Sequence, residues 1–468
     1  MSVVRQRFPR LRPFVAGVAL AAASFAAQAQ NLQQLYEAAR NYDATYLAVR
    51  AQTEAAQARL AQSGALRLPT VGLNASATRG GSDIPEYEVT VTNPVSGLPE
   101  TKTVPSARGY GNVNQAGITA RQPLYNKANS ETIAQAEKAY EVAIADLESA
   151  EQDLIVRLAL AYFDVLAAED TLATTRANKK AVTEALASAK RNFEVGTATI
   201  TDTREAQSRF DLVSAQEIAG LNDLASKRAA LDTLVGRSGV TPRPFALPIV
   251  IPPLVRNNVD EWLTNADADS PVLRRARLAY EIAQLETEKA RAGHLPTLDI
   301  VGTLSTNHNS GIVGAGTGSA QIPGLFKNGT IGVQLNWPLF AGFAVQNRVK
   351  ETLSLTEKTR NDLDGARRSV ALGTRQAFFG VESGRALVKA LEAAESSSKL
   401  ALEATEVGFK VGVRVALDVL NAQTTLFQTQ RDLAKARYDL VNGSFRLYQA
   451  SGQLKPEDVA AVTRLLAP

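Results

Sequence analysis

Apolar residues recur every three or four positions along two very long stretches of the chain. The first runs from Asn126 to about Arg191 without a proline or a glycine, and the second runs from Ala341 to about Val407. This heptad spacing predicts two long helices. About 66 helical residues at ~1.5 Å each extend roughly 100 Å, which is far longer than the core of a compact domain. Shorter stretches of the same period, 200–235 and 415–449, predict a return helix after each.

The period changes from 3.6 to 2 directly after Leu68-Pro69-Thr70 and again after Leu295-Pro296-Thr297. Apolar and small polar residues then alternate over 71–78 and 298–305, and a returning strand is predicted in each case at 116–125 and 330–340. Such alternation is typical of a strand with one face toward lipid and the other toward water. The sequence therefore predicts four membrane strands, although two soluble strand pairs packed on the helices would have the same period.

Aromatic residues stand at the ends of the returning strands. Trp337, Tyr125 and Phe340 are placed to form a belt at a membrane interface. Between the paired strands, 79–112 and 307–329 are rich in Gly, Pro, Ser and Asn and are predicted to be long loops. Long loops on one side and tight joins on the other suit an outer-membrane hairpin.

The sequence contains two copies of an internal repeat. Laying Phe193-Glu194-Val195-Gly196 on Phe409-Lys410-Val411-Gly412 places Asp202 opposite Asp418, at a constant offset of 216 residues. In both copies a helix runs into glycine and a second helix starts after a few β-branched residues. Gly196 and Gly412 are thus predicted to be left-handed residues in the turns of two helical hairpins. Asp202, with Glu205 three residues later, is predicted to cap the return helix of the first hairpin.

Each copy also begins with a helix, predicted at 31–67 and 258–293, and five prolines over 241–253 predict an extended linker between the copies. The predicted organisation is a signal peptide at 1–29, repeat 1 at 30–240, a Pro-rich linker at 241–257, repeat 2 at 258–453 and a C-terminal tail at 454–468.

The signal peptide is predicted from four separate arginines, an apolar run and the small-x-small site Ala27-Gln28-Ala29. Removing those arginines from a total of 51 Lys and Arg leaves 47, equal to the 47 Asp and Glu, so no basic surface for nucleic acid is expected. The chain has no cysteine and thus no thiol for a lipid anchor. After residue 30 no apolar run is long enough for a spanning helix, so membrane residence would rest on strands.

Four strands cannot close a barrel, because closure needs about eight. Open strand edges in lipid would leave backbone groups unsatisfied, so several copies must complete the sheet. Little in the sequence suggests catalysis. His294 and His308 are the only histidines, and 314–318 is a glycine-rich stretch without the lysine of a phosphate loop. No enzyme activity, cofactor or metal is therefore expected. Two function classes remain: an export duct, and a non-conducting periplasmic structural or adhesive coiled-coil protein.

A family resemblance is carried by the strand entries, by Trp337-Pro338-Leu339-Phe340, and above all by Val411-Gly412-Val413-Arg414 leading into 417–426 (LDVLNAQTTL). The mature chain resembles the TolC family of outer-membrane efflux and type I secretion channels. The resemblance implies a homotrimer with a twelve-strand outer-membrane β-barrel continuous with a twelve-helix periplasmic α-barrel. It also implies a periplasmic adaptor protein and an inner-membrane exporter, either proton-driven or of the ATP-binding-cassette type.

The same resemblance implies a gate at the hairpin tips. Asp418 matches a position whose three copies form an acidic ring at the periplasmic aperture. Asn421 stands where some members carry a second aspartate, which removes one of the carboxylates on which block by divalent cations would depend. Arg414 matches an arginine that holds neighbouring hairpins closed by binding residues that match Thr201 and Asp202; we call these three residues the clasp. Phe409 replaces a tyrosine of some members, so a phenolic hydrogen bond in the clasp is absent.

Overall fold

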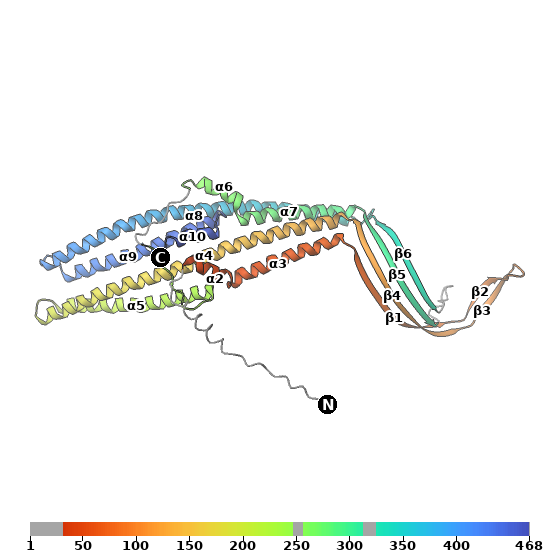
Figure 1. The fold of residues 1–468 in the computed structure, drawn as a ribbon, viewed down its shortest axis with the longest axis horizontal. Helices are drawn as coiled ribbons and strands as arrows, with labels where there is room; N and C mark the ends of the chain where they lie inside the picture. Colours follow the sequence, from red (N-terminus) through yellow and green to blue (C-terminus); the bar gives the residue numbers. More distant parts are fainter. Residues whose placement is uncertain (1–30, 247–255, 312–323, 468) are drawn as a thin grey trace, which may run out of the picture. The chain divides into compact units, whose positions relative to one another are not determined.

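The computed structural model describes residues 31–246, 256–311 and 324–467 (Figure 1). The predicted signal peptide, most of the Pro-rich linker and the centre of the second loop, 312–323, lie outside the described residues. The chain forms two compact units. The first comprises the described residues up to Thr53 together with 143–276 and 363–467, and the second comprises 54–142 and 277–362. Each unit contains pieces of both repeats.

The long helices, the return helices and the four strands of the main sheet follow one another in the predicted order, and a two-stranded ribbon and a short terminal helix are additional. The helices are α2 (Leu32–Arg40), α3 (Ala44–Gly64), η2 (Ala65–Arg67), α4 (Lys127–Glu194), α5 (Ile200–Val235), α6 (Val259–Asp269), α7 (Pro271–Arg291), η3 (Ala292–His294), α8 (Ala344–Lys410), α9 (Ala416–Ala450) and α10 (Pro456–Thr463). The strands are β1 (Thr70–Ile84), β2 (Tyr87–Thr92), β3 (Pro99–Val104), β4 (Ala107–Tyr125), β5 (Thr297–Gly311) and β6 (Gly324–Asn336). None of the described helices is both long and apolar enough to cross a membrane.

The two long helices and their return helices are confirmed. α4 has 68 residues and α8 has 67, and each ends in a tight turn that leads into α5 or α9. No element of the heptad pattern was misassigned, because a sustained period of 3.5 over so many turns has no strand interpretation.

The first predicted helix of each repeat is wrong in one respect, since each is broken in two. The helix predicted at 31–67 stops at Arg40 and restarts at Ala44, because the Asp43 carboxylate accepts the backbone N–H of Tyr46 at 2.8 Å and so caps a new helix. The helix predicted at 258–293 is broken between Asp269 and Pro271. Pro271 has no N–H to donate and holds the preceding residue in an extended conformation.

Four strands form one antiparallel sheet in the order β1-β4-β5-β6 (Figure 1). Leu73 lies opposite Ile118, and Ile118 lies opposite Leu304, so these side chains share one face. Apolar residues gather on that face and are exposed to differing degrees: Val71, Leu73, Ile118, Leu304, Ile331, Val333 and Leu335. The opposite face carries polar residues such as Asn74, Thr303 and Gln334. The period-2 pattern therefore predicts correctly which residues of a strand share a face.

The first loop prediction is wrong. Most of 79–112 is strand, because β1 and β4 continue to pair as far as Ile84 opposite Ala107. A separate two-stranded ribbon, β2 with β3, occupies the middle of the segment. In the second predicted loop, β5 extends to Gly311 and β6 already begins at Gly324. Glycine, serine and asparagine obscure the alternation, yet the ladder is held by backbone hydrogen bonds, to which such side chains are no obstacle.

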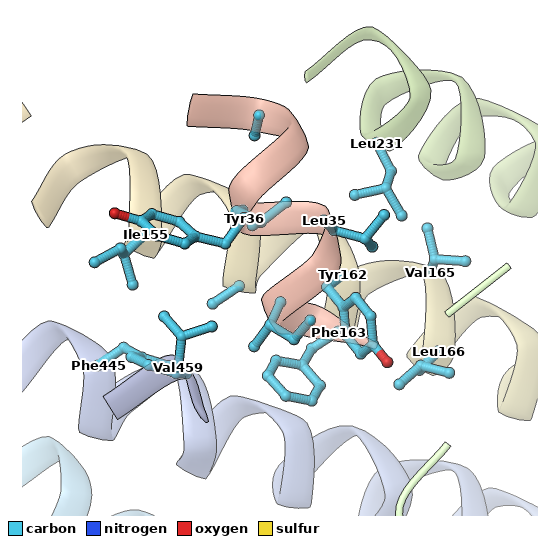
Figure 2. Close-up of a cluster of buried hydrophobic side chains, with 14 of the residues drawn as sticks. Leu35, Tyr36, Ile155, Tyr162, Phe163, Val165, Leu166, Leu231, Phe445 and Val459 are labelled. Carbon is cyan, nitrogen blue, oxygen red and sulfur yellow. The ribbon is translucent and has the colours of Figure 1, made fainter. Parts of the chain in front are cut away.

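The main hydrophobic core lies in the first unit, where α4 is surrounded by α2, α5, α9 and α10 (Figure 2). Tyr162 and Phe163 of α4 are completely buried there. Figure 2 shows them among Leu35 of α2, Leu231 of α5 and the α4 residues Val165 and Leu166, with Phe445 of α9 and Val459 of α10 nearby. The predicted tail thus contains a short helix whose Val459 completes the core.

Candidate functional site

The two hairpin tips have the same backbone turn. Gly196 and Gly412 both have a φ of +79°, which favours glycine, as the sequence predicts. The Gly196 N–H donates to the Phe193 carbonyl at 3.0 Å, and the Gly412 N–H donates to the Phe409 carbonyl at 3.1 Å. The next residue in each copy donates its N–H to a carbonyl five positions earlier. Thr197 bonds Asn192 at 2.8 Å, and Val413 bonds Gly408 at 2.9 Å. These are the paired bonds of a Schellman ending.

The cap of α5 differs from the prediction. Thr199, not Asp202, is the N-cap residue, and Asp202 occupies the third helical position. The Asp202 carboxylate accepts the backbone N–H of Thr199 at 2.9 Å and its hydroxyl at 2.8 Å. These hydrogen bonds to the charged form hold the pKa of Asp202 below its ordinary value. A threonine side chain can be both donor and acceptor, which is why the box forms three residues earlier than predicted.

The corresponding start of α9 is held more loosely. Val415 stands at the N-cap and has no polar side chain, so Asp418 is left with the Val415 N–H at 3.5 Å. Arg414 approaches the same carboxylate, with 3.6 Å between Nη1 and Oδ2. The stem of Arg414 lies over Gly408, where an added Cβ would come within 2.8 Å of the arginine Cγ. The tip of the second hairpin thus places an exposed arginine beside a partly buried aspartate.

Within the described residues, the predicted clasp pairs differently from the resemblance. Arg414 contacts Asp418 in its own hairpin, Asp202 contacts Thr199 in its own hairpin, and Thr201 is exposed. Among the described residues, Arg414 makes no hydrogen bond or ion pair with Thr201 or Asp202.

A different pair joins the hairpins near their tips. Arg209 of α5 donates from Nη2 to Oδ1 of Asn421 on α9 at 2.7 Å. Leu420, the preceding residue of α9, is buried in a cluster with Val182 of α4 and Val213 of α5. Asn421, predicted at the aperture, is therefore bound to the first hairpin.

The predicted interface aromatics lie at the ends of β4 and β6 in the second unit. Trp337 is half-exposed and donates its indole N–H to the His294 carbonyl at 3.2 Å. Phe340 is 73% exposed and meets Phe343 edge to face, with ring centroids 5.5 Å apart. Tyr125 ends β4 and is also exposed. Large aromatic side chains left open at the end of a strand suit the boundary between lipid and water.

One ion pair on the polar face of the sheet was not predicted. Arg121 of β4 and Asp299 of β5 lie 2.6 Å apart, and the Asp299 side chain is almost fully buried. His308, predicted in a polar loop, lies in β5 opposite Asn114. Among the described residues, no cluster of three or more His, Asp or Glu side chains could hold a metal ion. The glycine-rich stretch 314–318 lies outside the described residues.

Family comparison separates the two function classes that the sequence leaves open. The family described as outer membrane efflux protein matches residues 35–237 and 262–453, which fall within the two predicted repeats. The chain belongs to the outer membrane efflux protein family. As a member, it is an outer-membrane efflux channel rather than an enzyme.

Two relatives agree with this assignment, and one solved structure shares the fold. The chain is 31% identical over 453 residues to the outer membrane protein TolC of Vibrio cholerae serotype O1. The match covers 97% of this chain and 98% of the relative. The chain is 26% identical over 445 residues to the proteases secretion protein PrtF of Dickeya chrysanthemi, over 94% and 92% of the two chains. The CmeC outer membrane channel of Campylobacter jejuni matches in fold, with a TM-score of 0.72 and 16% identity over 94% of this chain and 90% of that one.

The resemblance to the TolC family and the fold class of long helices with four sheet strands are thereby confirmed. The pairing of Arg209 with Asn421 in this outer membrane efflux protein was not predicted. One signal was present, because Leu420 corresponds through the offset of 216 to Arg204 in the first repeat. An apolar residue in one copy where the other has an exposed charge indicates a burial that only one hairpin makes.

Proposed function

We propose that this outer membrane efflux protein is the exit duct of a tripartite export system, assembled as a homotrimer. A periplasmic adaptor protein and an inner-membrane exporter, proton-driven or of the ATP-binding-cassette type, would complete the system. The observation that carries the proposal is the four-stranded sheet, which has one exposed apolar face, one polar face and two outer strands that pair on only one side.

The sheet supports assembly by a simple argument. β1 and β6 each present a row of backbone groups that nothing in the four-stranded sheet pairs. In lipid each such group costs several kcal/mol, which makes an open edge untenable and favours β1 of one copy beside β6 of the next. Three copies give twelve strands, enough for a barrel with an aqueous interior. The apolar face would then meet lipid, and the polar face would line the duct.

The aromatic residues would fix the height of the sheet in the membrane. We propose that Trp337, Tyr125 and Phe340 lie at the periplasmic interface, because they follow the apolar face and remain open to the surroundings in the single chain. The helical hairpins would then extend into the periplasm. Residues 1–29 would be the cleaved signal peptide, and the mature chain would be organised as repeats 30–240 and 258–453 without a lipid anchor.

The gate is proposed at the hairpin tips. Three copies of Asp418 would form the acidic aperture, with Asn421 one helical turn further along α9. Gly196 and Gly412, with Phe409, would keep the turns tight. The proposed clasp of Arg414 with Thr201 and Asp202 would join different copies, which is compatible with the bonds that each residue makes inside its own hairpin.

The cargo follows from the relatives. The Dickeya protein is named for protease secretion, and the family is described by efflux. We propose that this duct passes both secreted proteins and small molecules, with the choice made by the inner-membrane exporter. A passive duct has no reaction to catalyse, which agrees with the expectation of no cofactor.

The test changes neighbouring residues on opposite faces of β6. Val333 lies on the apolar face and Gln334 on the polar face. Val333→Lys places a charge in lipid at a cost of about 2–4 kcal/mol near the midplane, whereas Gln334→Lys adds the same charge to the water-filled interior. We expect Val333→Lys to abolish assembled protein in outer-membrane fractions and export from cells, and Gln334→Lys to leave both. Equal assembly of the two variants would contradict the proposed lipid face.

A further inference from the structure

The contact between Arg209 and Asn421 joins two hairpins of the same chain. Both residues belong to the first unit, and 2.7 Å between Nη2 and Oδ1 is a short, well-formed hydrogen bond. Leu420, 5% exposed, enters the first hairpin beside it, between Val182 and Val213. Consecutive residues of α9 therefore bind the first hairpin, Leu420 by apolar burial and Asn421 by accepting a hydrogen bond from the Arg209 guanidinium.

The hairpins are also joined far from their tips, by contacts that do not depend on a single bond. Tyr438 of α9 donates its phenol to Asp170 of α4 at 2.7 Å, and its ring stacks on Phe163 and Phe245. Burial and the neighbouring carboxylate raise the pKa of Tyr438, so the phenol remains a donor. Seventeen helical residues separate Tyr438 from Asn421, or roughly 25 Å at ~1.5 Å per residue. The second hairpin is thus fixed at its base and held at its tip by a much smaller contact.

The tip contact is not a general consequence of the repeat. The residues that correspond to Leu420 and Asn421 in the first repeat are Arg204 and Glu205, and the residue that corresponds to Arg209 in the second is Thr425. Arg204 is exposed. The second hairpin contacts the first through Leu420 and Asn421, which have no counterparts of the same type in the first repeat. Loss of this contact would therefore leave the glycine turn that both hairpins share undisturbed.

The same side of α9 also carries a buried polar atom without a hydrogen-bond partner. Gln423 lies three residues after Leu420 and so on its side of the helix. Its Oε1 is buried and has no partner in the described part of the chain. A buried acceptor without a partner is a cost that disappears when water reaches it. One buried acceptor on this side of α9 is therefore unsatisfied within the described residues.

We propose that Arg209 and Asn421 form a latch that holds the tip of the second hairpin against the first, and that these positioning residues set how readily the duct entrance opens. This inference rests on the proposed function. Asn421 then serves as an acceptor for Arg209 rather than as an open polar group of the aperture. Because an amide binds a guanidinium less strongly than a carboxylate does, the latch is weak enough to release.

The test is a double-mutant cycle on single-channel recordings of the full protein in planar bilayers. Arg209→Ala removes the donor, and we expect the open fraction to rise roughly two- to tenfold, the range of one hydrogen bond. Asn421→Asp converts the contact to an ion pair, and we expect the open fraction to fall. In the Arg209→Ala background, Asn421→Asp should have no such effect. Arg209→Lys, which keeps the charge and a donor, should restore part of the closure.

Arg204→Ala is the matched control, because it removes an exposed arginine of the same helix and should leave the open fraction unchanged. If Asn421→Asp raises cation selectivity equally with and without Arg209, Asn421 faces the aperture and the latch is wrong. Channels that conduct with no coupling between the two positions also overturn the latch while leaving the duct intact. A wild-type protein that never conducts would instead overturn the proposed function. Hydrogen exchange over 416–425 checks folded variants independently, and Arg209→Ala should speed it.

Discussion

Two aromatic residues stand at the same place in both repeats, and the burial of the second residue differs between them. Tyr162 and Phe163 of α4 are fully buried, whereas their counterparts at the offset of 216, Phe378 and Phe379 of α8, are 6% and 54% exposed. The helices of the two hairpins follow in the same order and differ in length by one residue, 68 and 36 residues in the first repeat and 67 and 35 in the second. The difference in burial shows that repetition of the sequence reproduces the elements but not the surfaces that cover them.

Part of the cover over the first pair comes from segments outside the repeated hairpins. Phe163 stacks on Phe245, which follows α5, with ring centroids 5.4 Å apart. The Tyr162 hydroxyl bonds the backbone of Arg243, accepting its N–H at 2.7 Å. Phe245 in turn pairs with Leu466 near the chain's end, and α10 packs against α2. The linker and the tail therefore close the core over the first repeat and leave Phe379 open on the second.

The largest effect is expected from truncating this aromatic pair. Phe163→Ala opens a cavity in the main core and should cost about 3–5 kcal/mol of unfolding free energy. Phe379→Ala, the matched change at the equivalent position, should cost far less because half of that side chain is already exposed in the single chain. Thermal unfolding of the purified protein in detergent, followed by circular dichroism, compares the two. Similar losses would mean that Phe379 is buried as deeply as Phe163 in the assembled protein.

A smaller effect separates the two hairpin tips. Thr199→Val removes the side-chain cap of α5 and should cost about 1 kcal/mol, which speeds hydrogen exchange of the first-turn amides about fivefold. Val415→Thr supplies the missing cap to α9 and should slow exchange there by a similar factor. The variants are isosteric, and each leaves the other hairpin as an internal control. If Val415→Thr has no effect, the α9 start differs from the α5 start in more than its capping side chain.

The smallest effect is the response of the first tip to acid. Hydrogen bonds from Thr199 hold the pKa of Asp202 below its ordinary value of 3.8. A lowered pKa contributes stability that is complete above the ordinary value and is lost as the pH falls through the lowered one. Protection of the first turn of α5, corrected for intrinsic exchange rates, should therefore decline below about pH 4. The decline should be smaller in Thr199→Val, which keeps the backbone N–H donor to Asp202 but loses the hydroxyl donor. A decline of equal size in that variant would assign it to other carboxylates.

The sequence predicts long-range periodicity well and side-chain partners poorly. The heptads of α4 and α8, the alternation within each strand and the left-handed Gly196 and Gly412 depend on local rules that each segment carries by itself. The break at Asp43 depends partly on Arg157, which bonds that carboxylate twice at 3.0 Å from far along the chain. The pairing of Arg209 with Asn421 likewise joins residues more than two hundred positions apart. Such contacts require the packing of the helices to be known.

The capping error has a different cause. Asp202 followed by Glu205 satisfies the box pattern, but Thr199 followed by Asp202 satisfies it equally, and only the position of the turn decides between them. The turn glycine at 196 leaves three residues before the helix, so the earlier threonine becomes the cap. Boundaries of this kind shift by a few residues when two capping patterns overlap.

The central claim is that one chain supplies only a part of a membrane channel. Its most direct test is the mass of the conducting species, measured for the purified protein in detergent by light scattering and followed by insertion of the same fraction into a planar bilayer. The account predicts that conductance accompanies the mass of three chains and that fractions with the mass of one chain are silent. A folded monomer that conducts would contradict it, because four strands with two open edges would then suffice.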